Sequence, residues 1–211
     1  MTATLVEYLI ARDGVPPPSG VAYDYLLGGD GLYVAARNRC LEARVPVAAA
    51  TVRGLPPVYP SLALKTGRLA PAMWNRIVVE ARAWGRERRE VLLVVTHDDA
   101  AGYHLLRPRQ IVGATRVLYR PMTNVLMEVH SHHSGPACFS PTDDADEQRL
   151  CLYGVLGRLD SEGPEVALRI GAYGHFMSVP WEAAFEGERG DFRDVNFDCL
   201  QPVMQGDVLP D

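Results

Sequence analysis

The sequence predicts an α/β protein: a mixed α+β sheet flanked by helices, preceded by a small β-rich N-terminal extension. Three observations support this class. The 211 residues are 47% apolar, which suits one domain with a core and a smaller appendage. A helical period in the middle of the chain is followed by short apolar runs separated by turn residues. A second short helical segment then lies between two of those runs.

The predicted extension covers residues 1–68. Strands are expected at 31–38 and 41–52, with Gly31 and Pro46 as strand-breaking residues in them. Three prolines within 54–62 exclude a helix from that stretch. The extension either stands as a β-rich appendage or adds strands to the main sheet, and its sequence assigns it no role.

The main domain is expected over residues 69–190. Pro71 suits a helix start, and apolar side chains then recur at helical spacing, which predicts a helix over 71–84. The long apolar run at 90–97 predicts a central strand. Further strands are expected at 103–108, 114–121, 124–132, 151–159 and 165–174, and further helices at 140–150 and 180–188.

The remaining residues, 191–211, are expected to form an acidic C-terminal tail. The stretch from Trp181 to the end contains eight acidic residues and two arginines. The net charge of −5 gives no support to nucleic-acid binding, and no apolar run reaches the roughly 18 residues of a membrane helix. Four widely spaced cysteines and a start without a leader pattern favour reduced thiols in the cytoplasm.

The stretch "HSHHSGPACFSPTD", residues 130–143, predicts a metal site. Strand alternation places His130 and His132 on one side, and Asp143 falls in the first turn of a helix that Ser140 caps. An isolated H-x-H pair is more often solvent-facing, and "SPTD" alone is an ordinary helix start. Together they offer two nitrogens and one oxygen, which leaves a fourth position for water, as in catalytic zinc sites.

The spacing H-x-H, seven residues, Ser, two residues, Asp resembles the signature of the JAMM (MPN+, Mov34/JAB-type) zinc metalloproteases, in their prokaryotic JAB branch. The likeness covers about 71–180 and implies a cytidine deaminase-like JAB/MPN fold. It also implies an upstream catalytic Glu at a strand start, which Glu90 matches. The weaker candidates for this Glu are Glu80, Glu87 and Glu128. The family commonly has Pro where this chain has His133, which leaves the shape of the loop open.

The resemblance implies one Zn²⁺ held by His130, His132 and Asp143, with Glu90 as general base and then acid. It gives Ser140 the role of stabilising the oxyanion, although the same hydroxyl is also a helix cap. The implied activity is that of a zinc-dependent isopeptidase, similar to a deubiquitinase. Its substrate is a ubiquitin-like or sulfur-carrier protein with a Gly-Gly-type tail.

A narrower likeness, over "EVHSHHS", "FSPTDDADE" and "LYGVLGRLD", is to the protein A subfamily of PRTRC systems. Such proteins are encoded beside E1-like (ThiF) and E2-like proteins, which become the expected partners. Nucleic-acid and membrane partners are not expected.

Two other functions remain open at this point. One is a gated MPN scaffold or binding module of a bacterial ubiquitin-like conjugation system, although such inactive domains typically lack the ligand set that this chain keeps. The other is a metallohydrolase of the H-x-H amidohydrolase or phosphoesterase type. That fold needs further ligands downstream, where His175 is the sole remaining histidine.

Overall fold

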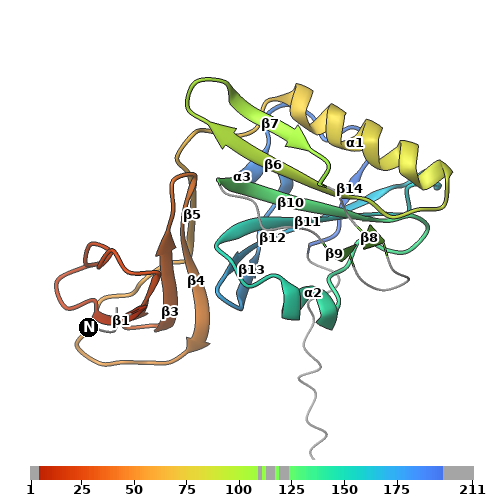
Figure 1. Cartoon of the computed structure of the whole chain (residues 1–211). Helices are drawn as coiled ribbons and strands as arrows, with labels where there is room; N and C mark the ends of the chain where they lie inside the picture. The colour runs from red at the N-terminus through yellow and green to blue at the C-terminus, as the bar shows by residue number, and fades with distance from the viewer. Residues whose placement is uncertain (1–4, 109–110, 113–116, 119–123, 197–211) are drawn as a thin grey trace, which may run out of the picture.

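The computed structural model describes residues 5–108, 111–112, 117–118 and 124–196. Within them the chain forms two large sheets, a two-stranded pair and three helices (Figure 1). The first sheet has five strands in chain order, with β1 parallel to β2 and the other neighbours antiparallel. Its strands are β1 (Val6–Ile10), β2 (Tyr23–Leu27), β3 (Gly31–Arg37), β4 (Leu41–Ala49) and β5 (Ser61–Leu64).

The second sheet has seven strands in the order β13-β12-β11-β10-β6-β7, with β14 paired to β12. Its strands are β6 (Leu92–Asp98), β7 (Gly102–Leu106), β10 (Val125–His132), β11 (Cys151–Gly157), β12 (Glu165–Ala172), β13 (His175–Ser178) and β14 (Arg193–Asp194). Strand β10 is parallel to β11 and antiparallel to β6. The two-stranded pair is β8 (Ile111–Val112) with β9 (Val117–Leu118).

Helix α1 (Pro71–Arg86) covers one side of the second sheet (Figure 1). Proline occupies its first turn, where a missing N–H costs nothing, and Trp74, Ile77 and Ala81 bury the face that their spacing predicted. The other side of the sheet carries α2 (Pro141–Asp146) and a smaller apolar cluster around Leu92 and Tyr153. The third helix, α3 (Trp181–Ala184), is a single turn.

The two sheets share one apolar core. Leu41 and Val45 of β4 belong to the same buried cluster as Leu168 and Ile170 of β12. Aromatic rings extend this junction, since Tyr23 stacks on Tyr173 with centroids 4.6 Å apart. Figure 1 shows the first sheet standing at the end of the second where β12 and β13 lie. The extension is therefore a separate sheet whose inner face is covered by the main domain.

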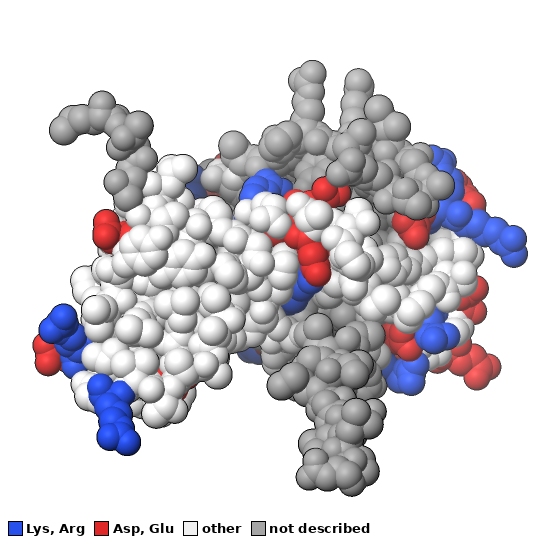
Figure 2. All heavy atoms as spheres, turned by 90° about the horizontal axis from the view of Figure 1, so that it is seen from below, with Lys and Arg blue, Asp and Glu red and all other residues white. Residues whose placement is uncertain are grey.

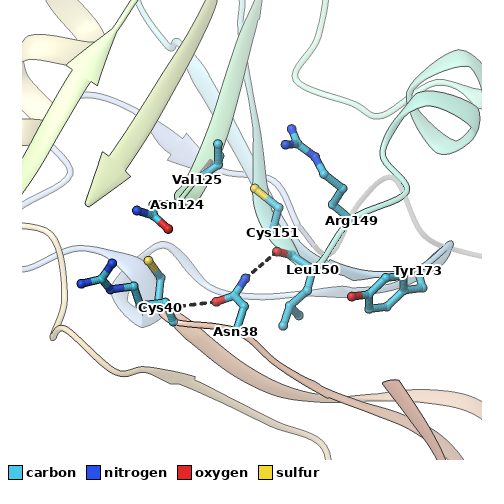
Figure 3. A pocket seen from close by; sticks show the side chains of 9 residues that line it. Asn38, Cys40, Asn124, Val125, Arg149, Leu150, Cys151 and Tyr173 are labelled. Carbon is cyan, nitrogen blue, oxygen red and sulfur yellow. Dashed lines mark hydrogen bonds between the residues drawn. The ribbon is translucent and has the colours of Figure 1, made fainter. Parts of the chain in front are cut away.

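A cavity of about 250 Å³ lies at this junction (Figure 3). Asn38 closes its floor: its side-chain amide donates to the carbonyl of Leu150 at 3.1 Å and its oxygen accepts from the backbone of Cys40 and Leu41. Cys40 and Cys151 line the cavity, and burial raises the pKa of both thiols. A raised pKa disfavours the thiolate, which is the nucleophilic form of cysteine.

The predicted α/β class is confirmed, and most predicted elements from 31 to 174 fall close to the observed ones; the helix expected at 140–150 is shorter than predicted and ends at Asp146. The strand expected at 114–121 lies partly outside the described residues, as does most of the expected tail at 191–211. The helix expected at 180–188 is shorter than predicted, because the backbone turns extended at Phe185. Strands β1, β2, β5 and β13 were not predicted.

Exposed large apolar side chains concentrate on the first sheet and its loops, and Figure 2 shows few charged atoms over this part of one face. They are Leu5, Tyr8, Ile10, Val15 and Tyr59. Within the described residues, no helix combines the length and the apolar character that a membrane crossing requires.

Candidate metal centre

His130 and His132 lie at the end of β10, on the side of the sheet that faces α2, since Nε2 of His130 lies 3.6 Å from Oδ1 of Asp143 in that helix. Side chains alternate along a strand, so the rings of both histidines project to this side. Val129, the residue before His130, projects to the opposite side and belongs to the main core. The two Nε2 atoms lie 3.2 Å apart. The Nδ1 of His132 lies 2.9 Å from the carbonyl of Pro136, which fixes its N–H there and leaves Nε2 as the free acceptor.

Asp143 approaches from the first turn of α2. Ser140 is the N-cap of this helix, and a capping box is present in which the Ser140 hydroxyl accepts from the Asp143 backbone N–H. The Oδ2 atom of Asp143 accepts hydrogen bonds from the backbone N–H and the hydroxyl of Ser140, at 2.6 and 2.7 Å. Its other oxygen, Oδ1, lies 3.6 Å from Nε2 of His130.

These three side chains fit a zinc ion. Their ligand atoms all lie within 4.8 Å of one another. Donors at the corners of a tetrahedron with bonds of about 2.0–2.1 Å are separated by about 3.3 Å. Two of the three separations, 3.2 and 3.6 Å, are close to that edge length, and the third, between His132 and Asp143, is at most 4.8 Å. Two imidazoles and one carboxylate are also a donor set that zinc accepts.

The protonation states suit metal binding. Burial lowers the pKa of His130 to about 4, against the attraction of Asp143, so its ring is neutral at pH 7. Burial of Asp143 opposes ionisation, but the attraction of His130 and the hydrogen bonds from Ser140 outweigh it and lower the pKa of this carboxyl. A neutral imidazole and an ionised carboxylate are the forms that bind a cation.

Glu90 lies two residues before the first residue of β6 and is exposed. The register of β6 against β10 pairs Leu92 with His130, and the backbone N–H of Ser131 donates to the carbonyl of Val91 at 3.0 Å. Continuing this antiparallel register by two residues beyond the Leu92–His130 pair sets Glu90 opposite His132. Directly opposed residues project to the same side of a sheet. Glu90 therefore stands at the edge of the face that carries the two histidines.

The other glutamates are less well placed. Glu128 lies on the histidine face but is buried and forms an ion pair with Arg149. Glu80 belongs to α1, on the opposite side of the sheet, and Glu87 is the C-cap of that helix with Arg89 3.7 Å away.

The Ser140 hydroxyl is engaged in the helix cap, as one of the two roles expected for it requires. The oxyanion role stays a prediction. His133 turns away from the cluster, as expected from alternation, and its Nδ1 packs at Gly85 of α1 without a hydrogen-bond partner.

The loop 133–139, here called the metal loop, is held by residues that the sequence did not reveal. Glu165 of β12 is buried, accepts from the backbone N–H of Ala137 at 3.1 Å, and pairs with Arg158 and Arg193. Arg169, four residues on, lies on the same side of β12 and contacts α2. Charged residues at alternate positions of the otherwise apolar run "EVALRIGA" were the available signal.

No curated protein matches the chain. A solution structure of a protein from Salinibacter ruber is 18% identical to it, covering 59% of this chain and 94% of that one with a TM-score of 0.37.

The model of the family described as prokaryotic homologs of the JAB domain matches residues 72–171. This range begins in α1, ends in β12 and contains all five predicted site residues. Over this segment, just under half of its length, the chain is similar to the prokaryotic JAB domain.

Proposed function

We propose that this protein is a zinc-dependent peptidase or isopeptidase that cleaves after the C-terminal tail of a ubiquitin-like or sulfur-carrier protein. One observation carries the proposal: His130, His132 and Asp143, from a strand end and a helix start, converge within 4.8 Å. Such convergence of two imidazoles and one carboxylate has little structural use, since apolar packing would stabilise the same place at lower cost.

The chain's own residues have distinct tasks in this reaction. Zinc, when bound by the three ligands, supplies a Lewis acid that lowers the pKa of water to about 7 and polarises the scissile carbonyl. Glu90 takes the proton of the attacking water and returns it to the leaving amine. The carbonyl of Pro136 keeps His132 in the tautomer that presents Nε2.

Ser140 gives the oxyanion a hydrogen-bond donor only when its hydroxyl leaves Asp143. When the hydroxyl turns away, the backbone N–H of Ser140 still donates a hydrogen bond to Oδ2 of Asp143, at 2.6 Å. The hydroxyl can therefore turn to the substrate without releasing the metal ligand, which reconciles the two roles expected for it.

The substrate class rests on the resemblance to JAMM isopeptidases and on the JAB family of residues 72–171. An extended tail can bind beside a sheet edge by backbone hydrogen bonds, and small residues suit a narrow site. The likeness to protein A of PRTRC systems adds E1-like and E2-like proteins of the same system as proposed partners. Cleavage of a fusion between a ubiquitin-like protein and a reporter is the direct assay.

Metal content tests the site first. The protein purified without chelator should carry roughly one zinc per chain, measured by elemental analysis, and should lose cleavage activity after chelation and regain it with zinc. His132→Ala and Asp143→Ala should each lose both metal and activity. Retention of stoichiometric zinc by both variants would assign the metal to other ligands.

Glu90→Gln tests the general base. This variant should bind zinc as the wild type does, yet cleave the fusion at least about 100-fold more slowly, since proton transfer contributes roughly 10²–10⁴ to such reactions. Glu87→Gln is the matched control, because Glu87 is exposed at the C-cap of α1, three residues before Glu90. This substitution should leave turnover unchanged. Full activity of Glu90→Gln would remove Glu90 from the mechanism.

A further inference from the structure

Helix α2, which carries Asp143, has little to hold it in place by itself. It is six residues long and contains no buried residue. Isolated helices below about 12–15 residues are marginal in water, and most helical stability in proteins comes from packing an apolar face. The position of the Asp143 carboxylate must therefore depend on contacts from outside the helix.

Arg169 of β12 supplies those contacts. Its guanidinium donates to Oδ1 of Asp144 at 2.6 Å and, through Nε and Nη2, to Oε2 of Glu147 at 2.9 and 2.6 Å. These carboxylates lie in the first turn and at the C-cap of α2, so one planar group spans the helix. Burial raises the pKa of Glu147 to about 8 despite the neighbouring guanidinium.

Arg169 is itself fixed by aromatic rings. Its Cζ lies 3.9 Å from the ring centroid of Phe139 and 3.8 Å from that of Phe176, and its side chain is only 8% exposed. Phe139 directly precedes Ser140, and its ring centroid lies 6.4 Å from that of His130. The guanidinium thus contacts both ends of the segment that delivers the carboxylate ligand.

We propose that Arg169 is a positioning residue for the metal centre: it holds α2 against β12 and so sets the place of Asp143, without touching the metal or the substrate. This inference rests on the proposed metal site for its effect on zinc, but its effect on α2 is independent of any metal. Glu165, four positions earlier on the same side of β12, holds the preceding loop by accepting a hydrogen bond from the backbone N–H of Ala137 at 3.1 Å.

Hydrogen–deuterium exchange on the metal-free protein tests the structural half. Arg169→Met keeps the aliphatic stem and removes the charge, and should speed exchange over 140–147 at least about 10-fold while β10 and β11 stay protected. Arg82→Met is the matched control, because Arg82 pairs with Asp191 at 2.7 Å and lies over the ring of Phe192, but projects from α1. Unchanged exchange over 140–147 in Arg169→Met overturns the proposal.

Zinc titration tests the functional half. Arg169→Met should weaken zinc affinity roughly 10- to 100-fold, the range typical of residues that orient a metal ligand, and Arg82→Met should not. Arg169→Lys should fall between, since an ammonium keeps the charge without the planar fork. A variant that loses only thermal stability, with wild-type zinc affinity, shows a structural role and overturns the proposal.

A second variant guards against a general loss of folding. Asp144→Asn alters a side chain that is 53% exposed, so the fold should survive, and it removes one of the two carboxylates. It should raise exchange in α2 and weaken zinc binding by less than Arg169→Met; no change in either overturns the proposal. If the wild type binds no zinc, the proposed function fails, and the exchange data alone still decide whether Arg169 holds α2.

Discussion

The two oxygens of Asp143 do different work. Oδ2 closes the helix cap with Ser140, and Oδ1 faces His130. A carboxylate at the third position of a capped helix is anchored on one side and free on the other, which explains why the spacing from Ser140 to Asp143 matters. The three proposed ligands could be named from sequence because their offsets are short and lie within one strand end and one helix start.

Ser140→Ala tests this division. Loss of the cap should lower the free energy of unfolding by about 1 kcal/mol, the usual value for a Ser N-cap, and should weaken zinc binding because Oδ2 loses one donor. Urea denaturation and zinc titration measure the two effects. Ser161→Ala, which removes an exposed turn hydrogen bond to the carbonyl of Arg158, is the control. Equal zinc affinity in both variants would show that the backbone N–H suffices.

At the scale of elements, the metal loop depends on a close approach to β11. Gly157 ends that strand beside His132, and a Cβ atom there would overlap the backbone of Pro136 and Ala137. Only glycine leaves room for the loop, whose Pro136 carbonyl orients His132. Sequence alone predicted the strand and the loop but not their contact, because the contact joins elements about 20 residues apart.

Gly157→Ala should displace this loop. We expect a loss of zinc affinity of at least about 10-fold, as for other groups that orient metal ligands, together with reduced stability. Gly163→Ala is the control, since its Cβ would meet only the flexible Arg193 side chain at 3.4 Å. Zinc titration in the two variants compares them directly; wild-type affinity in Gly157→Ala would mean that the loop relaxes freely.

At the scale of the whole molecule, the N-terminal sheet and the main domain share one core. Leu41 of β4 is fully buried in the cluster that also contains Trp74 and Trp181. The three tryptophans, Trp74, Trp84 and Trp181, all lie outside the N-terminal sheet. Their fluorescence therefore reports on the main domain alone, which makes the coupling between the two parts measurable.

Leu41→Ala should lower the denaturant midpoint seen by tryptophan fluorescence, because a buried Leu→Ala change costs about 2–5 kcal/mol and the shared core unfolds as a unit. Val15→Ala, at a residue that is 47% exposed, should leave it unchanged. An unaltered midpoint in Leu41→Ala, with a separate transition in far-UV circular dichroism, would show two independently folding parts.

The sequence by itself determined the α/β class, helix α1, strand β10 and the three proposed ligands. Each follows from a local rule: a period of 3.6 or 2, a cap, or a spacing within 14 residues. Strands β1 and β2 were missed because their alternation is weak: β1 pairs along one edge only, and much of its surface remains exposed.

Only the tertiary structure decided what surrounds the ligands. The burial that lowers the pKa of His130, the contact of Arg169 with Asp144 of α2, and the register that pairs Leu92 with His130 all arise between segments far apart in the chain. Local sequence patterns identify the side chains that can donate a lone pair to a metal ion. The strength and placement of a metal site depend on desolvation and on distant charges, and these exist only once β6, β10, β11 and β12 lie side by side.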